Sequence, residues 1–159
     1  MRLYDSPRVT QDLDLAVKTL DIERIVATLY ELGHVLVVEV DERAALSAPD
    51  PSAANRWIES DRPGSLTFIA KPATAANLGD RLRAEHTVID IQSQVDVLYE
   101  LSVPFPRLRS RAGILQLAGT PVAVASPQDL IVLKEARRDR SPADDYDIAY
   151  LRRLLQSKQ

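Results

Sequence analysis

Two aspartates near the N-terminus have the spacing of paired metal ligands. Asp12 and Asp14 stand two residues apart, and an apolar run continues from them to Val17. In a strand, residues i and i+2 point to the same face of the sheet, so the two carboxylates would lie side by side. Adjacent carboxylates repel each other, and a divalent cation relieves the repulsion. Because hard oxygen ligands suit Mg²⁺, we predict a magnesium or manganese site; a solvated loop is the alternative.

A third acid follows much later in the chain. Asp96 lies between the aliphatic residues Val95 and Val97. A carboxylate in an apolar strand costs free energy unless it is paired or ligated, so we predict that Asp96 completes the metal site. Two alternatives stay open: Asp96 lies on the exposed face of an edge strand, or Asp90, which has similar surroundings, is the third acid.

The elements that must position these acids follow a strand–helix–strand pattern. We predict a helix that begins after the N-cap residue Asp21 and ends at Gly33, because its apolar residues recur at helical spacing. Residues 35–40 are rich in valine and indicate a buried strand. Further strands are predicted over residues 66–70, 87–91 and 95–101 and a short helix over 53–59, while 74–84 fits a helix or a loop.

The last part of the chain is expected to be mostly helical. Pro104 and Pro106 break the chain after the last strand of the sheet, and a hairpin over residues 113–125 follows. Ser126 is the predicted N-cap of a helix with proline at its first position, and a final helix is predicted over residues 143–155.

Together these elements predict the α+β class. The expected core is a mixed β-sheet with flanking helices over residues 1–125, and helices over residues 126–159 pack on that core. A chain of 159 residues is long enough to bury such a core without disulfides or structural metals.

The composition excludes several classes of protein. With 45% hydrophobic and 27% charged residues the chain is globular and not disordered. It has no cysteine, which excludes disulfides, thiolate zinc sites and cysteine nucleophiles. No stretch approaches the roughly 20 apolar residues that span a membrane, and the start of the chain lacks a signal-peptide pattern. We therefore expect a cytoplasmic protein that does not enter membranes.

The charge pattern is less decisive. A net charge of −3 argues against a nucleic-acid-binding surface that extends over the whole molecule. Two groups of arginines belong either to solvated faces or to patches that bind a polyanion. The first group is Arg107, Arg109 and Arg111, and the second is Arg137, Arg138 and Arg140.

Four stretches of the sequence together resemble a known family. They are RVTQDLDLAV from Arg8, VDVL from Val95, VASPQDLIVLK from Val124 and DDYDIAYL from Asp144. In this order they resemble the Pol β-type nucleotidyltransferase superfamily, and most closely its AbiEii/MNT-like branch, which occurs in bacterial toxin–antitoxin pairs. The resemblance covers most of the chain and implies a nucleotidyltransferase fold.

The resemblance also implies a reaction and its acidic residues. A nucleoside monophosphate would pass from an NTP to an RNA or protein acceptor, with two Mg²⁺ or Mn²⁺ ions as cofactors. Asp12 and Asp14 would hold both metals and the triphosphate. Asp96 would hold the catalytic metal and help to deprotonate the acceptor hydroxyl. The implied partners are an NTP, tRNA or another RNA or a protein acceptor, and a cognate antitoxin.

Three further residues are assigned to the nucleotide by the same resemblance. Lys134 would meet phosphate as a point charge, and its alternative is an ordinary surface lysine on a helix. Arg8 and Thr10 would orient phosphate or stiffen the turn before the acids, and for these two a structural role is favoured.

One feature of the superfamily is not found at the expected place. Its members carry a glycine-containing turn before the acidic strand, where backbone N–H groups cradle the triphosphate. Residues 1–6 contain no glycine. We therefore expect a helix encoded ahead of Met1, an apolar patch near Leu13 and Leu15, and a tendency to form homodimers or aggregates. The alternative functions are a catalytically inactive relative that acts as a binding or regulatory partner, and a plain globular domain.

Overall fold

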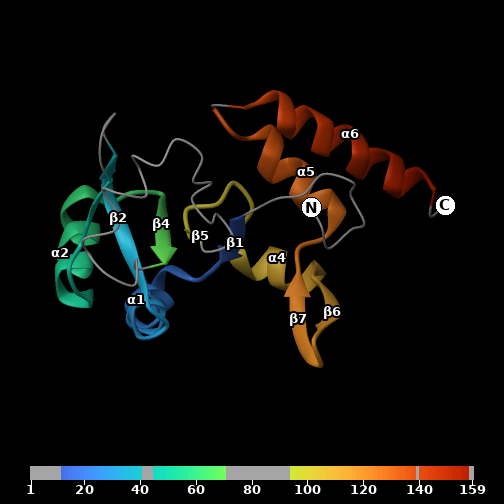
Figure 1. The fold of residues 1–159 in the computed structure, drawn as a ribbon. Coiled ribbons are helices and arrows are strands. Elements are labelled where there is room, and N and C mark those ends of the chain that lie inside the picture. The colour runs from blue at the N-terminus through green and yellow to red at the C-terminus, as the bar shows by residue number, and fades with distance from the viewer. Residues whose placement is uncertain (1–11, 41–44, 71–93, 139, 158–159) are drawn as a thin grey trace, which may run out of the picture. The chain divides into compact units, whose positions relative to one another are not determined.

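The structure is a computed structural model that describes residues 12–40, 45–70, 94–138 and 140–157 (Figure 1). Its class is α+β, as the sequence predicted, with a mixed five-stranded sheet and a second, two-stranded sheet. Contacts divide the chain into two compact units, one over Gln11–Glu100 and one that includes Leu101–Gln159. The sequence put the boundary after residue 125, whereas by contacts the hairpin of residues 113–124 groups with the C-terminal helices.

The first unit contains the five-stranded sheet. Its spatial order is β1 (Asp12–Ala16), β5 (Gln94–Leu98), β4 (Ser65–Ala70), β2 (His34–Val40) and β3 (Ala45–Ser47). The β1–β5 pair is parallel, and the other pairs are antiparallel. The strands predicted over residues 35–40, 66–70 and 95–101 are therefore confirmed within a few residues. The predicted strand 87–91 and the segment 74–84 lie outside the described residues.

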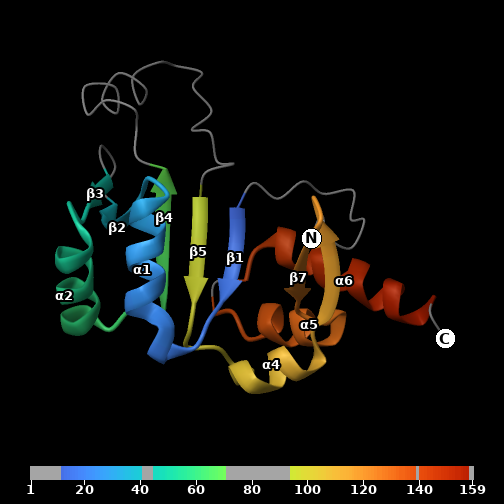
Figure 2. The ribbon, with the colours of Figure 1, turned by 90° about the horizontal axis from the view of Figure 1, so that it is seen from below.

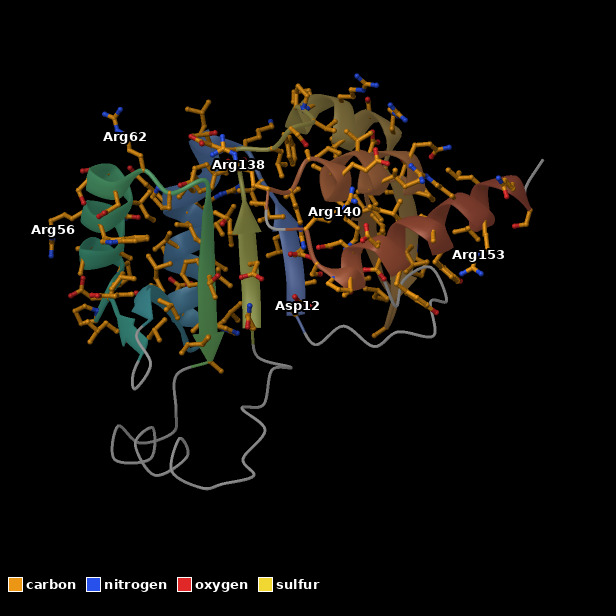
Figure 3. All side chains as sticks on the ribbon, turned by 90° about the horizontal axis from the view of Figure 1, so that it is seen from above. Asp12, Arg56, Arg62, Arg138, Arg140 and Arg153 are labelled. Atoms are coloured by element: carbon orange, nitrogen blue, oxygen red, sulfur yellow. The ribbon has the colours of Figure 1, made fainter. Side chains whose placement is uncertain are left out.

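Both described helices of this unit cover the same face of the sheet. Helix α1 (Ile22–Glu31) follows a short 3₁₀ turn (Thr19–Asp21), and α2 (Pro51–Asp61) follows β3. Figure 2 shows both helices in front of the sheet, and Figure 3 shows the opposite face. The fully buried side chains between helices and sheet include Val26, Leu36, Ala54, Phe68 and Val97.

The residues next to each helix explain where α1 ends and where α2 begins. Gly33, which follows the C-cap residue Leu32 of α1, has a positive φ of 83°. Glycine adopts this conformation without steric cost, and the predicted helix end is confirmed. The short helix predicted over residues 53–59 is longer than expected. It begins earlier because the side chain of Asp50 accepts a hydrogen bond from the Ala53 N–H and Pro51 occupies the first turn.

Tyr30 joins helix α1 to the edge of the sheet. The N–H of Ala48 donates to the Leu36 carbonyl at 2.9 Å. The Leu36 N–H and the Ala48 carbonyl are connected through the Tyr30 hydroxyl. This hydroxyl accepts a hydrogen bond from the Leu36 N–H at 3.2 Å and donates one to the Ala48 carbonyl at 2.8 Å. The Tyr30 ring packs edge-on against Phe68. Burial raises the pKa of Tyr30, while the hydrogen bond from Leu36 opposes that rise and the charge of Asp50 adds to it.

The described part of the second unit consists of a hairpin and three helices. The elements are α4 (Phe105–Arg111), β6 (Gly113–Leu117), β7 (Thr120–Val124), α5 (Pro127–Glu135) and α6 (Pro142–Gln156). The predicted hairpin and the last two helices are confirmed. Ser126 and Ser141 cap α5 and α6, and Ser141 forms a reciprocal capping box with Asp144.

The structure has a helix, α4, where the two prolines predict only a break in the chain. Pro104 is its N-cap and Pro106 lies in its first turn, where the missing N–H has no intrahelical partner to lose. The prolines therefore begin the helix. Within the described part of the chain, no helix has the length and apolar character that crossing a membrane requires.

The Tyr30 bridge predicts the effect of one deleted oxygen. Tyr30→Phe leaves the Leu36 N–H and the Ala48 carbonyl without this partner, so we expect unfolding in urea to need about 1 to 3 kcal/mol less free energy. Tyr146→Phe is the matched control, because Tyr146 is exposed on α6, and it should change stability by less than ~0.5 kcal/mol. Equal effects of the two variants would contradict the bridging role.

Candidate functional site

The parallel pairing of β1 with β5 brings the sequence-predicted acids together. Asp14 is aligned with Asp96, and Asp12 is aligned with Gln94. Neighbouring strands are about 4.8 Å apart, and aligned residues point to the same face. Asp12, Asp14 and Asp96 therefore share one face of the sheet, as their spacing predicted. It is the face opposite α1 and α2, with Asp12 at the beginning of β1 (Figure 3).

The face is arranged in two rows that cross the sheet. One row contains Asp14, Asp96, Thr67 and Val37, and the other contains Asp12, Gln94, Ile69 and Val35. The β1–β5 side of each row is polar, and the β2 side is apolar. Oxygen and amide groups thus gather at the β1 edge of the sheet.

Asp96 is the most constrained of the three acids. It is half-buried, whereas Asp12 and Asp14 are exposed. Its Oδ1 accepts a hydrogen bond from the Thr67 hydroxyl at 2.7 Å, and its Oδ2 accepts one from Gln94 Nε2 at 3.1 Å. The acid in an apolar strand is therefore compensated by neutral donors. The sequence analysis does not predict a role for Thr67 or Gln94. The one available signal is that Thr67 stands between the apolar residues Leu66 and Phe68, which places it on the opposite face of the strand from them.

The three carboxylates share a face without converging on one point. Among the described residues, which include all three acids, no group of three or more His, Asp or Glu side chains is arranged to hold a metal ion. The donor set still suits a hard cation, because it consists of oxygen ligands on adjacent strands. The metal role of these acids stays a prediction.

Three of the sequence-predicted positions lie outside the described residues. These are Arg8 and Thr10, assigned to the triphosphate, and Asp90, the alternative third acid. Their roles stay predictions.

Lys134 is held inside the second unit by two carboxylates. Its ammonium lies 2.9 Å from Asp144 Oδ1 and 2.9 Å from Asp147 Oδ2, and the lysine side chain is only 13% exposed. The two aspartates are three residues apart on α6, so they lie on one side of that helix. Arg137 contributes a further contact to Asp144 at 3.2 Å. Lys134 therefore differs from the exposed lysine of the alternative interpretation, and its predicted contact with phosphate is untested.

Asp144 shows how strongly this cluster is coupled. Burial raises the pKa of Asp144, but hydrogen bonds from Lys134 and Ser141 and the positive charge of Lys134 outweigh burial, and the pKa falls from 3.8 to about 2. The ionised carboxylate is thus part of the folded state of α5 and α6.

The two groups of arginines divide into paired and unpaired side chains. Arg111 contacts the buried Asp129 at 3.4 Å, and Arg140 contacts Asp145 at 2.9 Å. In the described part of the molecule, Arg107, Arg109 and Arg138 form no ion pair, and all three are exposed.

Charge is distributed unevenly along the chain. Residues 101–159 contain ten Lys and Arg against six Asp and Glu, which gives a net charge of +4. Residues 11–100 contain eight Lys and Arg against sixteen Asp and Glu, which gives −8. The modest total charge therefore conceals a basic and an acidic part, and the basic part contains both groups of arginines.

No protein-family model matches this sequence, and a search of curated proteins found no match. The resemblance to nucleotidyltransferases therefore rests on the four sequence stretches and stays a prediction.

The low pKa of Asp144 predicts a pH dependence of stability. Its folded-state pKa of about 2 lies below the ordinary value of 3.8, so its ionisation stabilises the fold above about pH 4, and this contribution is lost as the pH falls from 4 to 2. The parent should be more stable than Asp144→Asn at pH 6. This difference in unfolding free energy, measured in urea, should be ~2 kcal/mol smaller at pH 2. A pH-independent difference in stability between the parent and Asp144→Asn would contradict this coupling.

Proposed function

We propose that this protein is a metal-dependent nucleotidyltransferase of the Pol β-type superfamily, related to its AbiEii/MNT-like branch and located in the cytoplasm. It transfers a nucleoside monophosphate from an NTP to an acceptor hydroxyl. The observation that carries the proposal is the parallel register of β1 and β5, which aligns Asp14 with Asp96 on the face that also contains Asp12. A pair of acids two residues apart and a third acid on the adjacent strand match the order of carboxylates that the resemblance implies.

The three carboxylates have separate tasks in this proposal. Asp12, Asp14 and Asp96 would together hold two Mg²⁺ or Mn²⁺ ions, which would supply positive charge to the triphosphate and the leaving group. Asp96 accepts a hydrogen bond on each oxygen and retains lone pairs on both. It can therefore bind a cation and accept the proton of the acceptor hydroxyl.

The chemical step is a substitution at phosphorus. The acceptor oxygen forms a bond to the α-phosphorus of the NTP, and the bond from that phosphorus to the oxygen bridging to the β-phosphate breaks. Pyrophosphate leaves with the bonding electron pair, and the hydroxyl proton passes to the carboxylate of Asp96. No oxidant or reductant is needed.

The charge of the chain favours an RNA acceptor over a protein acceptor. Residues 101–159 have a net charge of +4, and eight of their ten basic residues are arginines. Arginine binds phosphate in a bidentate geometry that lysine cannot provide. The exposed arginines Arg107, Arg109 and Arg138 form no ion pair among the described residues, so their charge is available to a polyanion.

A second function is favoured by one observation. Lys134, the cation assigned to the nucleotide, is held by Asp144 and Asp147. An inactive nucleotidyltransferase-fold protein that acts as a binding or regulatory partner, such as a component of a toxin–antitoxin pair, would have no need of a lysine that contacts phosphate. The two functions differ in the transfer reaction alone, because an inactive relative can still bind cations.

Metal binding is the first test of the proposal. A cation that binds only the folded state stabilises it, by about 2.7 kcal/mol when present at 100 times its Kd. Saturating Mg²⁺ or Mn²⁺ should therefore raise the Tm of the parent protein, and the double variant Asp12→Asn, Asp14→Asn should lose this response. Differential scanning calorimetry with and without metal measures both effects.

The matched control removes two negative charges elsewhere in the same unit. Glu59→Gln with Asp61→Asn changes two exposed acids on α2 and should leave the metal response intact. A metal response that survives in Asp12→Asn, Asp14→Asn would remove these acids from the site.

Incubation with radiolabelled NTPs and RNA then separates the two functions, because label transfer that requires Asp96 indicates an enzyme.

A further inference from the structure

Two neutral side chains hold the Asp96 carboxylate from different directions. Thr67 lies directly opposite Asp96 on β4, and its Oγ1 donates a hydrogen bond to Oδ1 at 2.7 Å. Gln94 lies two residues before Asp96 on β5, and its Nε2 donates to Oδ2 at 3.1 Å. All three side chains are half-buried. Each carboxylate oxygen thus has one donor of its own.

This arrangement fixes the plane of the carboxylate. An aspartate rotates about two side-chain bonds, and a single hydrogen bond would leave the second oxygen free to swing. Donors on both oxygens restrict that rotation, yet each oxygen keeps a second lone-pair direction. The open lone pairs therefore point in defined directions on the face that Asp96 shares with Asp12 and Asp14.

The neighbouring positions show that the contacts are specific to Thr67. Ser65 lies two residues away on the same strand and the same face, but it is exposed and forms no side-chain hydrogen bond within the described residues. Val37, the other neighbour of Thr67 across the sheet, is apolar. The hydroxyl of Thr67 therefore has Asp96 as its side-chain partner in this row.

We propose that Thr67 and Gln94 are positioning residues that orient Asp96 for a divalent cation. The inference rests on the proposed function, because it assigns to these two residues the tuning of the same site. Neither residue is a ligand in this proposal. Partners that orient a metal ligand typically contribute 10- to 100-fold to metal affinity, so their loss should weaken cation binding while the three acids remain in place.

The test is a titration of the protein with Mn²⁺, monitored by calorimetry or by the electron paramagnetic resonance signal of free Mn²⁺. Thr67→Val keeps the shape of the side chain without the donor, and Gln94→Leu removes the amide. Each should raise the Kd for Mn²⁺ by about 10- to 100-fold. Thr67→Ser keeps the hydroxyl and should bind Mn²⁺ within about threefold of the parent, and Ser65→Ala should match the parent.

Asp96→Asn separates failure of this inference from failure of the proposed function. Loss of Mn²⁺ binding in Asp96→Asn, together with unchanged binding in Thr67→Val and Gln94→Leu, overturns the positioning role alone. Unchanged binding in Asp96→Asn, or no binding by the parent, overturns the proposed metal site and the positioning role with it. If Thr67→Val does not fold, the comparison of Gln94→Leu with the parent decides. A lowered metal-free Tm with an unchanged Kd indicates a purely structural role and contradicts the inference.

Discussion

The parallel contact between β1 and β5 is the interaction on which the candidate site depends. These strands are distant in sequence, and β1 has no other described neighbour in the sheet. The side-chain period of a strand is two, so a shift of one residue in this pairing would turn Asp96 away from Asp14. Val17 extends the contact beyond the strand, because its N–H donates to the Leu98 carbonyl at 3.0 Å.

The pairing register of these strands is stabilised by the apolar side chains on the opposite face of the sheet. Leu66, Phe68 and Val97 are buried against α1 and α2, and each stands next to a polar residue of the candidate site. Burial of these three side chains therefore fixes Thr67 and Asp96 on the face away from the helices. Leu15 packs on the same core, while Leu13, nearer the start of β1, is 51% exposed. The hydrophobic core thus positions the acids from the opposite face of the sheet.

The parts of this fold that could be predicted are those with local causes. Gly33 ends a helix because of its own backbone freedom, and Ser126 begins one because its hydroxyl accepts from a nearby N–H. The pair Asp12 and Asp14 is local too. The start of α4 was missed because proline at a helix N-terminus and proline in a loop look alike in sequence.

The partners of these residues could not be predicted in the same way, because they come from other segments. Thr67 reaches Asp96 only through strand pairing, and an uncharged threonine gives no signal of its own. Lys134 meets Asp144 and Asp147 across two helices. The three-residue spacing of those two aspartates places them on one side of their helix, but it does not indicate which residue faces them.

The enclosure of Lys134 also has a chemical consequence. An amine reacts with acylating reagents only when its nitrogen is accessible, and this nitrogen faces two carboxylates in a side chain that is 13% exposed. Lys18, in contrast, lies exposed just after β1. A brief pulse of an amine-reactive label should therefore mark Lys18 first and reach Lys134 only when α5 and α6 separate. The rate at which Lys134 is labelled would therefore report how often those two helices separate.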